Sequence, residues 1–538
     1  MSKVVSNCLS GLLLAGVVLA GCGGGGGGGD AGDGGDPYAP PVGGTPSAPV
    51  DGSAWTQFGS TAQHTAVSAT AAQDLARIRW RVPVDLAPPY RPSGALLAHY
   101  ASPVVTSHNT VLVPVKTDAA GGFRVDARAG GNGVLLWSAS TDYVLPPHNW
   151  VPSYNIALSS TNRVYAPGAG GKLLYRDSAD TATNTATWQT LVFYGSAAYG
   201  AAPAAFDQSV FINTPITVDA QGTVYFGFVV TGANPAGLSS GIARIGADGS
   251  GSWASAAALA GDATIAKVAM NSAPAVSNDG LTLYVVVNAA SAATPIGVQY
   301  GYLLALDSQT LTLRRRAGLV DPRTAVVARI SDDATSSPLV GPDGDVFIGV
   351  LESAAGSHNS RGWLLHFDST LASAKTPGSF GWDNTPSIVP ASMIPSYAGA
   401  SSYLLLTKYN NYAGTPSGDG RNRVAVLDPN GVQADLVIAS VTVMQEVLTI
   451  LGPTPDPAAP AGGVKEWCIN TAAVDPATGS VLINSEDGYL YRWDLATNGF
   501  TQQIRMNNGV GQSYTPTAVG ADGAVYAVNN ATLHSLGR

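Results

Sequence analysis

The sequence predicts an all-β fold, a β-propeller built from four-stranded antiparallel blades. The stretch Asn470–Asp494 alternates short apolar runs with Asp/Gly/Pro turns, which is the pattern of a meander of antiparallel strands. Similar openings and strands recur along the chain, as expected of blades in a ring. Of the 538 residues, 64 are Gly, 35 are Pro and only 12% are charged, and this composition favours tight turns over long helices.

The chain begins with the features of a secretory signal. Lys3 is followed by the short apolar stretch Leu9–Ala20, which is too short for a comfortable transmembrane helix. The junction Leu19-Ala20-Gly21-Cys22 resembles the bacterial lipobox, whose cysteine is lipidated and becomes the first residue of the mature protein. This resemblance implies that residues 1–21 are a lipoprotein signal peptide and that Cys22 carries the acyl chains.

Residues 22–53 are predicted to be a flexible tether between this anchor and the folded body. Gly23–Gly29 and the Asp/Gly/Pro mixture up to Val50 favour a solvated coil. A non-acidic residue after a lipidated cysteine, here Gly23, usually accompanies sorting to the outer membrane. We therefore expect residues 54–538 to form a single propeller domain anchored at the bacterial outer membrane, on its periplasmic or cell-surface side.

A small or polar residue, then Pro, then an apolar run opens most of the expected blades, while one opening has Ala in place of Pro. The eight openings are Ser102-Pro103, Val151-Pro152, Thr214-Pro215, Ala273-Pro274, Ser337-Pro338, Thr385-Pro386, Asn470-Thr471 and Thr515-Pro516. They predict eight blades, with seven as the alternative. The last opening leaves room for only about three strands, so we expect Ile78–Val84 to supply the outer strand of the last blade and close the ring.

Several of these motifs together resemble the pyrroloquinoline-quinone-repeat propellers, which include quinoprotein alcohol dehydrogenases and the outer-membrane β-barrel-assembly lipoprotein. The matching parts are Trp55-Thr-Gln-Phe-Gly, Gln63-His64-Thr65, the blade openings and strand ends such as Leu304-Ala305-Leu306-Asp307. The resemblance covers Trp55–Arg538. It implies, for the enzymes of the family, a quinone stacked on a vicinal disulfide, a calcium ion held by Glu, Asn and Asp, and a tryptophan docking motif in each blade.

This sequence departs from the enzyme branch. It has no Cys-Cys pair, and the blade-end tryptophan recurs only at Trp137, Trp188 and Trp253. Gly237-Leu238-Ser239-Ser240-Gly241 has the letters of a nucleophile elbow but precedes an expected strand, and the seven histidines show no metal-ligand spacing. We expect no catalytic residue, no metal and no cofactor, with quinone and calcium disfavoured.

Binding residues are expected at two places. Positions just before the blade openings surround the mouth of the central channel of a propeller, and the Asn410–Asn422 loop concentrates Tyr and Asn, which are adaptable contact residues. The alternative is structural, because Asn and Asp also satisfy backbone groups at strand starts. The predicted ligand- or partner-binding residues are Tyr100, Trp150, Asn213, Asn271, Asn384, Tyr409, Asn411, Tyr412, Glu466, Trp467, Asn470 and Tyr514.

The net charge of −9 and the lack of a basic stripe argue against a nucleic-acid partner. The sequence favours a lipid-anchored, extracytoplasmic propeller that is a non-catalytic binding or scaffold protein and contacts the membrane through its lipid only. One alternative is an enzyme, either a divergent quinoprotein dehydrogenase or an envelope hydrolase. Another is a subunit of an outer-membrane assembly complex. The sequence leaves the identity of the ligand or partner open.

Overall fold

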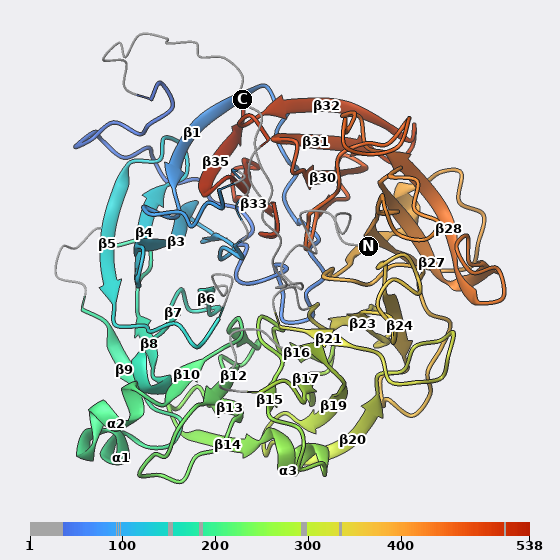
Figure 1. Ribbon diagram of the computed structural model, residues 1–538. Helices are drawn as coiled ribbons and strands as arrows, with labels where there is room; N and C mark the ends of the chain where they lie inside the picture. The colour runs from blue at the N-terminus through green and yellow to red at the C-terminus, as the bar shows by residue number, and fades with distance from the viewer. Residues whose placement is uncertain are drawn as a thin grey trace.

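The protein is described by a computed structural model over residues 36–92, 94, 96, 98–148, 154–181, 187–291, 298–332, 336–509 and 513–538. Eight antiparallel sheets follow one another around a central axis, with their short strands innermost (Figure 1). The predicted all-β propeller of eight blades is thus confirmed.

The blades are numbered along the chain, and their strands are given from the axis outward. Blades 1 to 4 consist of β2 (Val104–Val105), β3 (Thr110–Asp118), β4 (Gly121–Ala129) and β5 (Leu135–Thr141); β6 (Ala157–Leu158), β7 (Val164–Pro167), β8 (Leu173–Arg176) and β9 (Gln189–Leu191); β11 (Thr217–Val218), β12 (Val224–Val230), β13 (Gly241–Ile245) and β14 (Gly251–Ser255); and β16 (Ala275–Val276), β17 (Thr282–Asn288), β19 (Gly301–Asp307) and β20 (Leu313–Gly318). Blades 5 to 8 consist of β22 (Leu339–Val340), β23 (Val346–Val350) and β24 (Trp363–Phe367); β25 (Ser387–Pro390), β26 (Tyr403–Tyr409), β27 (Arg423–Ala434) and β28 (Thr442–Leu451); β29 (Ala473–Asp475), β30 (Ser480–Asn484), β31 (Tyr489–Asp494) and β32 (Gly499–Arg505); and β33 (Ala518–Val519), β34 (Val525–Asn529), β35 (Thr532–Gly537) and β1 (Arg77–Pro83).

The remaining elements are short. β10 (Val210–Ile212) and β15 (Lys267–Val268) pair with β12 and β17, so the innermost strand is split in two in blades 3 and 4. A small ladder joins β18 (Val298–Gln299) to β21 (Ile330–Ser331). The described helices are α1 (Ser196–Ala201), α2 (Pro203–Asp207), α3 (Ala256–Ala260) and the 3-10 turns η1 (Ala169–Gly171) and η2 (Ala391–Met393).

The blade openings replace ladder hydrogen bonds where the innermost strand is interrupted. In blade 3, Thr214 Oγ1 accepts the N–H of Gly227 on β12 at 2.8 Å and donates to the carbonyl of Pro215 at 2.9 Å. Ser336 Oγ accepts the N–H of Gly349 at 3.0 Å in blade 5. A small hydroxyl is required because the side chain must reach a backbone group where Pro has removed a donor.

Blade 2 opens differently from the prediction. Val151-Pro152 lies outside the described residues, and the hydrogen-bonding position in front of β6 is held by Asn155, whose Oδ1 accepts the N–H of Ser102 at 3.0 Å. Asn470 does the same in blade 7, where its Oδ1 accepts the N–H of Thr385 at 3.4 Å. Asn155-Ile156-Ala157 therefore repeats the Pro-less opening of Asn470-Thr471-Ala472, because an amide oxygen links neighbouring blades without a proline.

The segment Trp55–Gln73, called the girdle below, lies across one end of the channel and contacts the blades in their order along the chain (Figure 1). In seven blades it meets the second residue of the innermost strand, and in blade 8 it meets the turn that follows. The contacts are Trp55 with Val105, Thr56 with Leu158, Gln57 with Val218, Ala62 with Val276, Gln63 with Val340, Thr65 with Ile388, Ala66 with Val474 and Gln73 with Gly523. All are backbone hydrogen bonds except that of Gln57.

Gln57 provides its contact through the side chain because the girdle backbone turns away there. Gly59 and Ser60 have positive φ, and the N–H of Ser60 bonds back to the carbonyl of Gln57. The buried Gln57 amide then donates to the carbonyl of Val218 at 3.1 Å and accepts its N–H at 2.8 Å. A carboxamide offers a donor and an acceptor side by side, as a peptide group does.

The ring closes as predicted. β1 pairs antiparallel with β35, from Arg77 opposite Gly537 to Pro83 opposite Thr532. Trp80 is buried beneath this seam, and its indole N–H donates to the carbonyl of Gly130 in blade 1. The first described strand is therefore the outer strand of the last blade, which leaves that sheet paired.

Residues 36–53, predicted as part of the tether, are seated on blades 8 and 1. The N–H of Arg81 donates to the carbonyl of Tyr38, Asn132 bonds to Thr45 and Ser47, and the N–H of Gly52 donates to Ser107. Polar groups of the blades bind this segment, although few of its own side chains are buried. The folded body thus includes residues before Ala54.

Blade 5 has three regular strands. Its fourth position is held by two isolated bridges, Leu364 with Gly378 and Phe367 with Ala374. The long hairpin of β27 and β28 reaches over from blade 6, where the N–H of Met444 donates to the carbonyl of Pro377. Val441 and Val443 from this hairpin join the blade 5 core, so a neighbouring blade covers the edge.

We predict that Gln57→Ala lowers the free energy of unfolding by roughly 1–3 kcal/mol, because it leaves the buried N–H and C=O of Val218 without partners. Chemical denaturation followed by tryptophan fluorescence measures this loss. Gln221→Ala, at an exposed position of the same blade, is the control. Equal stability of the Gln57→Ala and wild-type proteins would contradict the structural role of the girdle.

Candidate functional site

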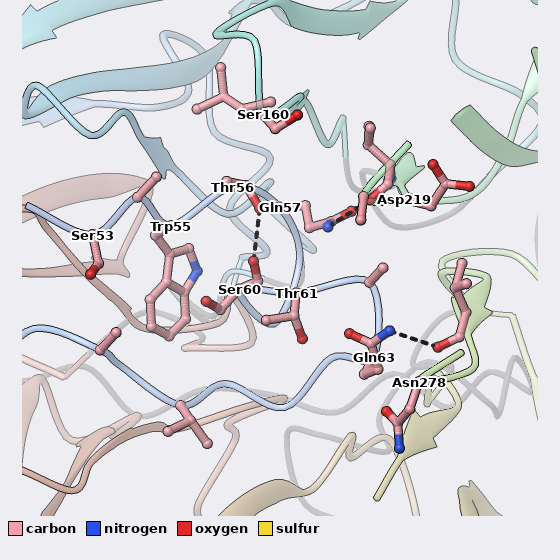
Figure 2. A pocket seen from close by; sticks show the side chains of 18 of the residues that line it. Ser53, Trp55, Thr56, Gln57, Ser60, Thr61, Gln63, Ser160, Asp219 and Asn278 are labelled. Atoms are coloured by element: carbon pink, nitrogen blue, oxygen red, sulfur yellow. Dashed lines mark hydrogen bonds between the residues drawn. The ribbon is translucent and has the colours of Figure 1, made fainter. Parts of the chain in front are cut away.

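A pocket of about 470 Å³ lies on the girdle side of the ring (Figure 2). One wall is formed by Ser53 and Ala54 and by the girdle residues 55–57, 60–63 and 67–69. The other wall is formed by the turns that connect the two innermost strands in blades 2, 3 and 4, namely Ser160, residues 219–221 and residues 277–280. The pocket exists because the girdle crosses these turns at a distance instead of packing flat on them.

The floor of this girdle pocket is apolar. Leu158, Val218 and Val276 contribute the second residues of three innermost strands, and Trp55 is 1% exposed. The Trp55 Nε1 has no hydrogen-bond partner among the described residues. The base of the pocket is therefore apolar, and the Trp55 ring is buried in the core with Ala66 and Val105.

The rim is polar. Thr56 Oγ1 donates to the carbonyl of Ser60, and the Gln63 amide donates to the carbonyls of Val276 and Ser277, as Figure 2 shows in part. Ser53, Ser160 and Asn278 line the opening. Hydroxyl and carboxamide groups are held in place by short turns, so the rim presents both donors and acceptors.

Two carboxylates lie in the lining, and both are engaged by their own turns. Asp219 Oδ1 accepts the N–H groups of Gln221 and Thr223, and Oδ2 accepts the Tyr225 hydroxyl. Asp279 accepts the Ser277 hydroxyl and the N–H of Leu281, and these hydrogen bonds lower the pKa of its carboxyl. No Lys, Arg or His is among the residues lining the pocket.

Sequence reasoning did not assign this site. Trp55–Gly59 and Gln63–Thr65 stand out as a family motif but carry no sign of a pocket, because the opposite wall lies more than a hundred residues later. The sequence feature that could have indicated the pocket is the polar and aromatic segment ahead of the first strand.

Six of the residues predicted at the blade openings lie at the other end of the channel and are buried. Asn213 Nδ2 donates to Val268, Asn384 Nδ2 donates to Thr407, and Asn470 links blades 6 and 7. The Asn271 N–H donates to the carbonyl of Asn213, the Tyr100 hydroxyl donates to Asp85, and Tyr514 stacks on His99 with centroids 4.8 Å apart. These contacts join neighbouring segments of the ring, in agreement with the structural alternative. Trp150 lies outside the described residues.

The Tyr/Asn cluster is mostly packing as well. Tyr412 is fully buried near Phe380, and Tyr409 donates its hydroxyl to Glu446 while Arg361 lies over its ring at 4.2 Å. Asn411 is partly exposed and bonds to Asn359 and Asp419. The binding role of these side chains stays a prediction, and Asn411 is the member that solvent reaches.

Trp467 is 1% exposed and packs against Tyr491 and Phe500. The Asn410 amide clamps its backbone, accepting from the N–H and donating to the carbonyl of Trp467. Truncation of such a side chain typically costs about 3–5 kcal/mol. Trp467→Ala and Tyr412→Ala are therefore expected to lower the stability of the core. A test of ligand binding at these positions needs substitutions that preserve the packing.

Glu466 belongs to a buried group with Cys468 and Glu486, whose oxygen and sulfur atoms lie within 4.8 Å of one another. Glu486 Oε1 accepts the N–H of Glu466 at 3.0 Å, and its Oε2 lies 3.2 Å from Cys468 Sγ. Burial raises the pKa of the Glu486 carboxyl to about 7, because the charged form loses its hydration. We assign no ion to this group.

No protein-family model matches the sequence, and no curated protein matches it. Solved structures do resemble the fold. A europium-containing methanol dehydrogenase has a TM-score of 0.52 at 8% identity over 88% of each chain, and the quinohemoprotein alcohol dehydrogenase from Comamonas testosteroni has a TM-score of 0.53 at 12% identity over 90% of this chain and 81% of that one. BamB from Moraxella catarrhalis reaches a TM-score of 0.40 at 11% identity, covering 85% of this chain and 100% of its own, which is too low to support an argument.

At these identities the likeness shows the fold alone. The chain has the eight-bladed propeller of the quinoprotein dehydrogenases, as the sequence resemblance implied. Lipid attachment and a place in the lipoprotein branch stay predictions.

We predict that Glu486 makes the stability of the fold depend on pH. Its folded-state pKa, about 7, exceeds the ordinary value of 4.5, so its contribution is full below 4.5 and is lost as the pH rises through 7. Glu486→Gln keeps an acceptor for the Glu466 N–H and is expected to flatten the decline in melting temperature between pH 5 and about 8. Asp248→Asn, on an exposed turn, is the control, and an unchanged pH profile for Glu486→Gln would refute the assignment.

Proposed function

We propose that this protein is a non-catalytic binding protein of the bacterial envelope, anchored by a lipid on Cys22, which takes a neutral, hydroxyl-rich ligand in the girdle pocket. The lining of that pocket is the observation that carries the proposal. An apolar floor with a rim of hydroxyl and amide groups suits the alternating apolar and hydroxylated faces of a sugar. The two acids in the lining are occupied by their own turns.

The opposite end of the channel is built largely from bonds between blades. Its Asn, Thr and Ser side chains bond to neighbouring blades, as Ser102 with Asn155 and Thr385 with Asn470 illustrate. These groups stabilise the ring, which leaves the girdle pocket as the better candidate for a ligand.

The quinone of the resembling enzymes does not fit the residues present. Those enzymes stack it on two adjacent cysteines, whereas the three cysteines of this chain, at positions 8, 22 and 468, are far apart in sequence. We derive no step through a quinone and propose that none is resident.

A dehydrogenase is the second candidate, because the fold is shared with two such enzymes over 88% and 90% of this chain. Dye-linked alcohol oxidation by protein reconstituted with quinone and calcium would favour it. Envelope hydrolysis and membership of an assembly complex remain sequence-based alternatives, tested by polymer turnover and by co-purification with a barrel protein.

The proposed anchor lies outside the described residues. Among the residues that are described, the helices have six residues at most and none is long and apolar enough to cross a bilayer. We propose that acyl chains on Cys22 hold the domain at the outer membrane and that the domain meets the membrane in no other way.

We predict that Cys22→Ser frees the protein from membranes or leaves it unprocessed, because the acyl chains supply the stable anchor. Fractionation after a high-salt wash, with immunoblotting, measures this. If processed Cys22→Ser protein is retained as well as the wild type, another anchor exists.

We predict that Ala220→Arg weakens ligand binding about tenfold or more, because Ala220 is exposed in the lining and a long arginine side chain would fill the space of the ligand. Ala477→Arg is the matched control, at an exposed position in the equivalent turn of blade 7 and outside the pocket. Binding is screened on an array of neutral oligosaccharides and each hit is measured by calorimetry. The proposal fails if no neutral sugar binds, or if both variants lose affinity equally.

A further inference from the structure

A second cleft is lined by the end of β32 and the residues that follow it, by β1 and by the turn between β34 and β35. Blades 7 and 8, to which these elements belong, are neighbours in the ring (Figure 1). Two cavities, of about 270 Å³ and 490 Å³, share Arg81, Met506, Asn507 and Asn530 in their linings. They therefore form one continuous cleft, remote from the girdle pocket and with none of its lining residues.

The cleft carries more positive than negative side chains, whereas the charged groups that line the girdle pocket are the two carboxylates of Asp219 and Asp279. Arg505 is exposed at the end of β32, and its guanidinium is oriented by the carbonyl of Asn507 at 3.2 Å and by Asn508 Oδ1 at 3.0 Å. Within the described part of the chain Arg505 forms no ion pair. Its positive charge is thus fixed in position and not neutralised.

Arg81 already pairs with an anionic side chain of the protein in this cleft. Its Nε donates to Asp36 Oδ2 at 2.7 Å, and its guanidinium lies 5.3 Å from the centre of the Tyr38 ring. Asp36 and Tyr38 come from the segment seated on the outside of blade 8. The Asp36 carboxylate of the chain itself is therefore already paired with the Arg81 guanidinium. The side chains of Arg81 and Asp36 are 30% and 36% exposed, so a stronger anion can replace the Asp36 carboxylate.

Neutral groups complete the lining. Asn507 is fixed by its bonds to Asn529 and to the N–H of Gly509, and Asn530 accepts the Tyr90 hydroxyl through Oδ1, which leaves its Nδ2 for other acceptors. His534 lies across the strand pair from Arg81, is 1% exposed, and its Nδ1 makes no hydrogen bond to any described residue. Burial and the charge of Arg81 lower the pKa of His534 to about 4, so the ring is neutral and retains one N–H donor.

We propose that this cleft is an oxyanion site, in which the phosphate or carboxylate group of a small ligand binds between Arg81 and Arg505 and displaces the Asp36 carboxylate. Arginine suits this role because its planar guanidinium pairs with two oxygens at once. The amide N–H of Asn530 provides a neutral donor to a remaining oxygen. Asp36 is a built-in competitor for the site.

Two conservative variants test the proposal in the full chain. Asp36→Asn removes the competitor and is expected to tighten binding by about tenfold, whereas Arg505→Gln is expected to weaken it by about tenfold, the usual scale of one charged hydrogen bond. Arg315→Gln is the matched control, since Arg315 is an exposed arginine on the outer strand of blade 4. Inorganic phosphate and succinate are the probes, measured by calorimetry at fixed ionic strength.

The outcomes separate specific from general binding. Tightening in Asp36→Asn together with weakening in Arg505→Gln alone supports the site, and the preferred probe tells a phosphate from a carboxylate ligand. Equal weakening in Arg315→Gln would show a general charge effect and overturn the proposal. Failure of both probes to bind Asp36→Asn would overturn it as well, without bearing on the neutral ligand of the girdle pocket.

Discussion

The propeller depends on one chain of hydrogen bonds, that between the girdle and the innermost strands. Six of the eight innermost strands have only two residues, so each blade offers little to hold its neighbour at the axis. The girdle gives these strands a common partner, as Trp55 does for Val105 and Ala66 for Val474. It also forms one wall of the girdle pocket, so the same segment ties the blades together and shapes this pocket. A change in the girdle would therefore alter both the stability of the ring and the shape of the pocket.

Much of the architecture could be predicted from the sequence because short stretches of residues determine it. Turn residues and apolar runs mark each blade, and the short last repeat indicates that Ile78–Val84 closes the ring. Long-range features could not be read in this way. Nothing near Gln57 reveals that its amide serves Val218, and nothing near blade 5 shows that its edge is covered by a hairpin of blade 6. The Pro-less opening at Asn155 was missed because its signal, an Asn two residues before Ala, is weaker than the neighbouring Val-Pro.

The candidate site was harder to predict than the fold, for a physical reason. Aromatic and amide residues before a strand suit a binding surface and a propeller core equally well. The two locations differ only in how far these side chains are buried. Trp467 and Tyr412 have the composition of a contact surface, yet they lie against Tyr491 and Phe380. Asn213 and Asn470 are amides because they bridge blades. The girdle pocket and the arginine cleft, in contrast, are assembled from segments hundreds of residues apart, so no local pattern marks either one.

The order in which the girdle meets the blades also constrains how the molecule folds. Gln73 bonds to Gly523 and Arg79 to Asp522, so these two residues near the N-terminal end of the domain find their partners only when nearly the whole chain has been made. Contacts of such long sequence separation carry a large loop-closure entropy and form slowly. Each blade is a local meander that can form early, whereas sealing of the ring must come last. A chain of this design would spend the interval before sealing as an open arc of blades with unsatisfied axial edges, and that interval is when chaperones or proteases would meet it.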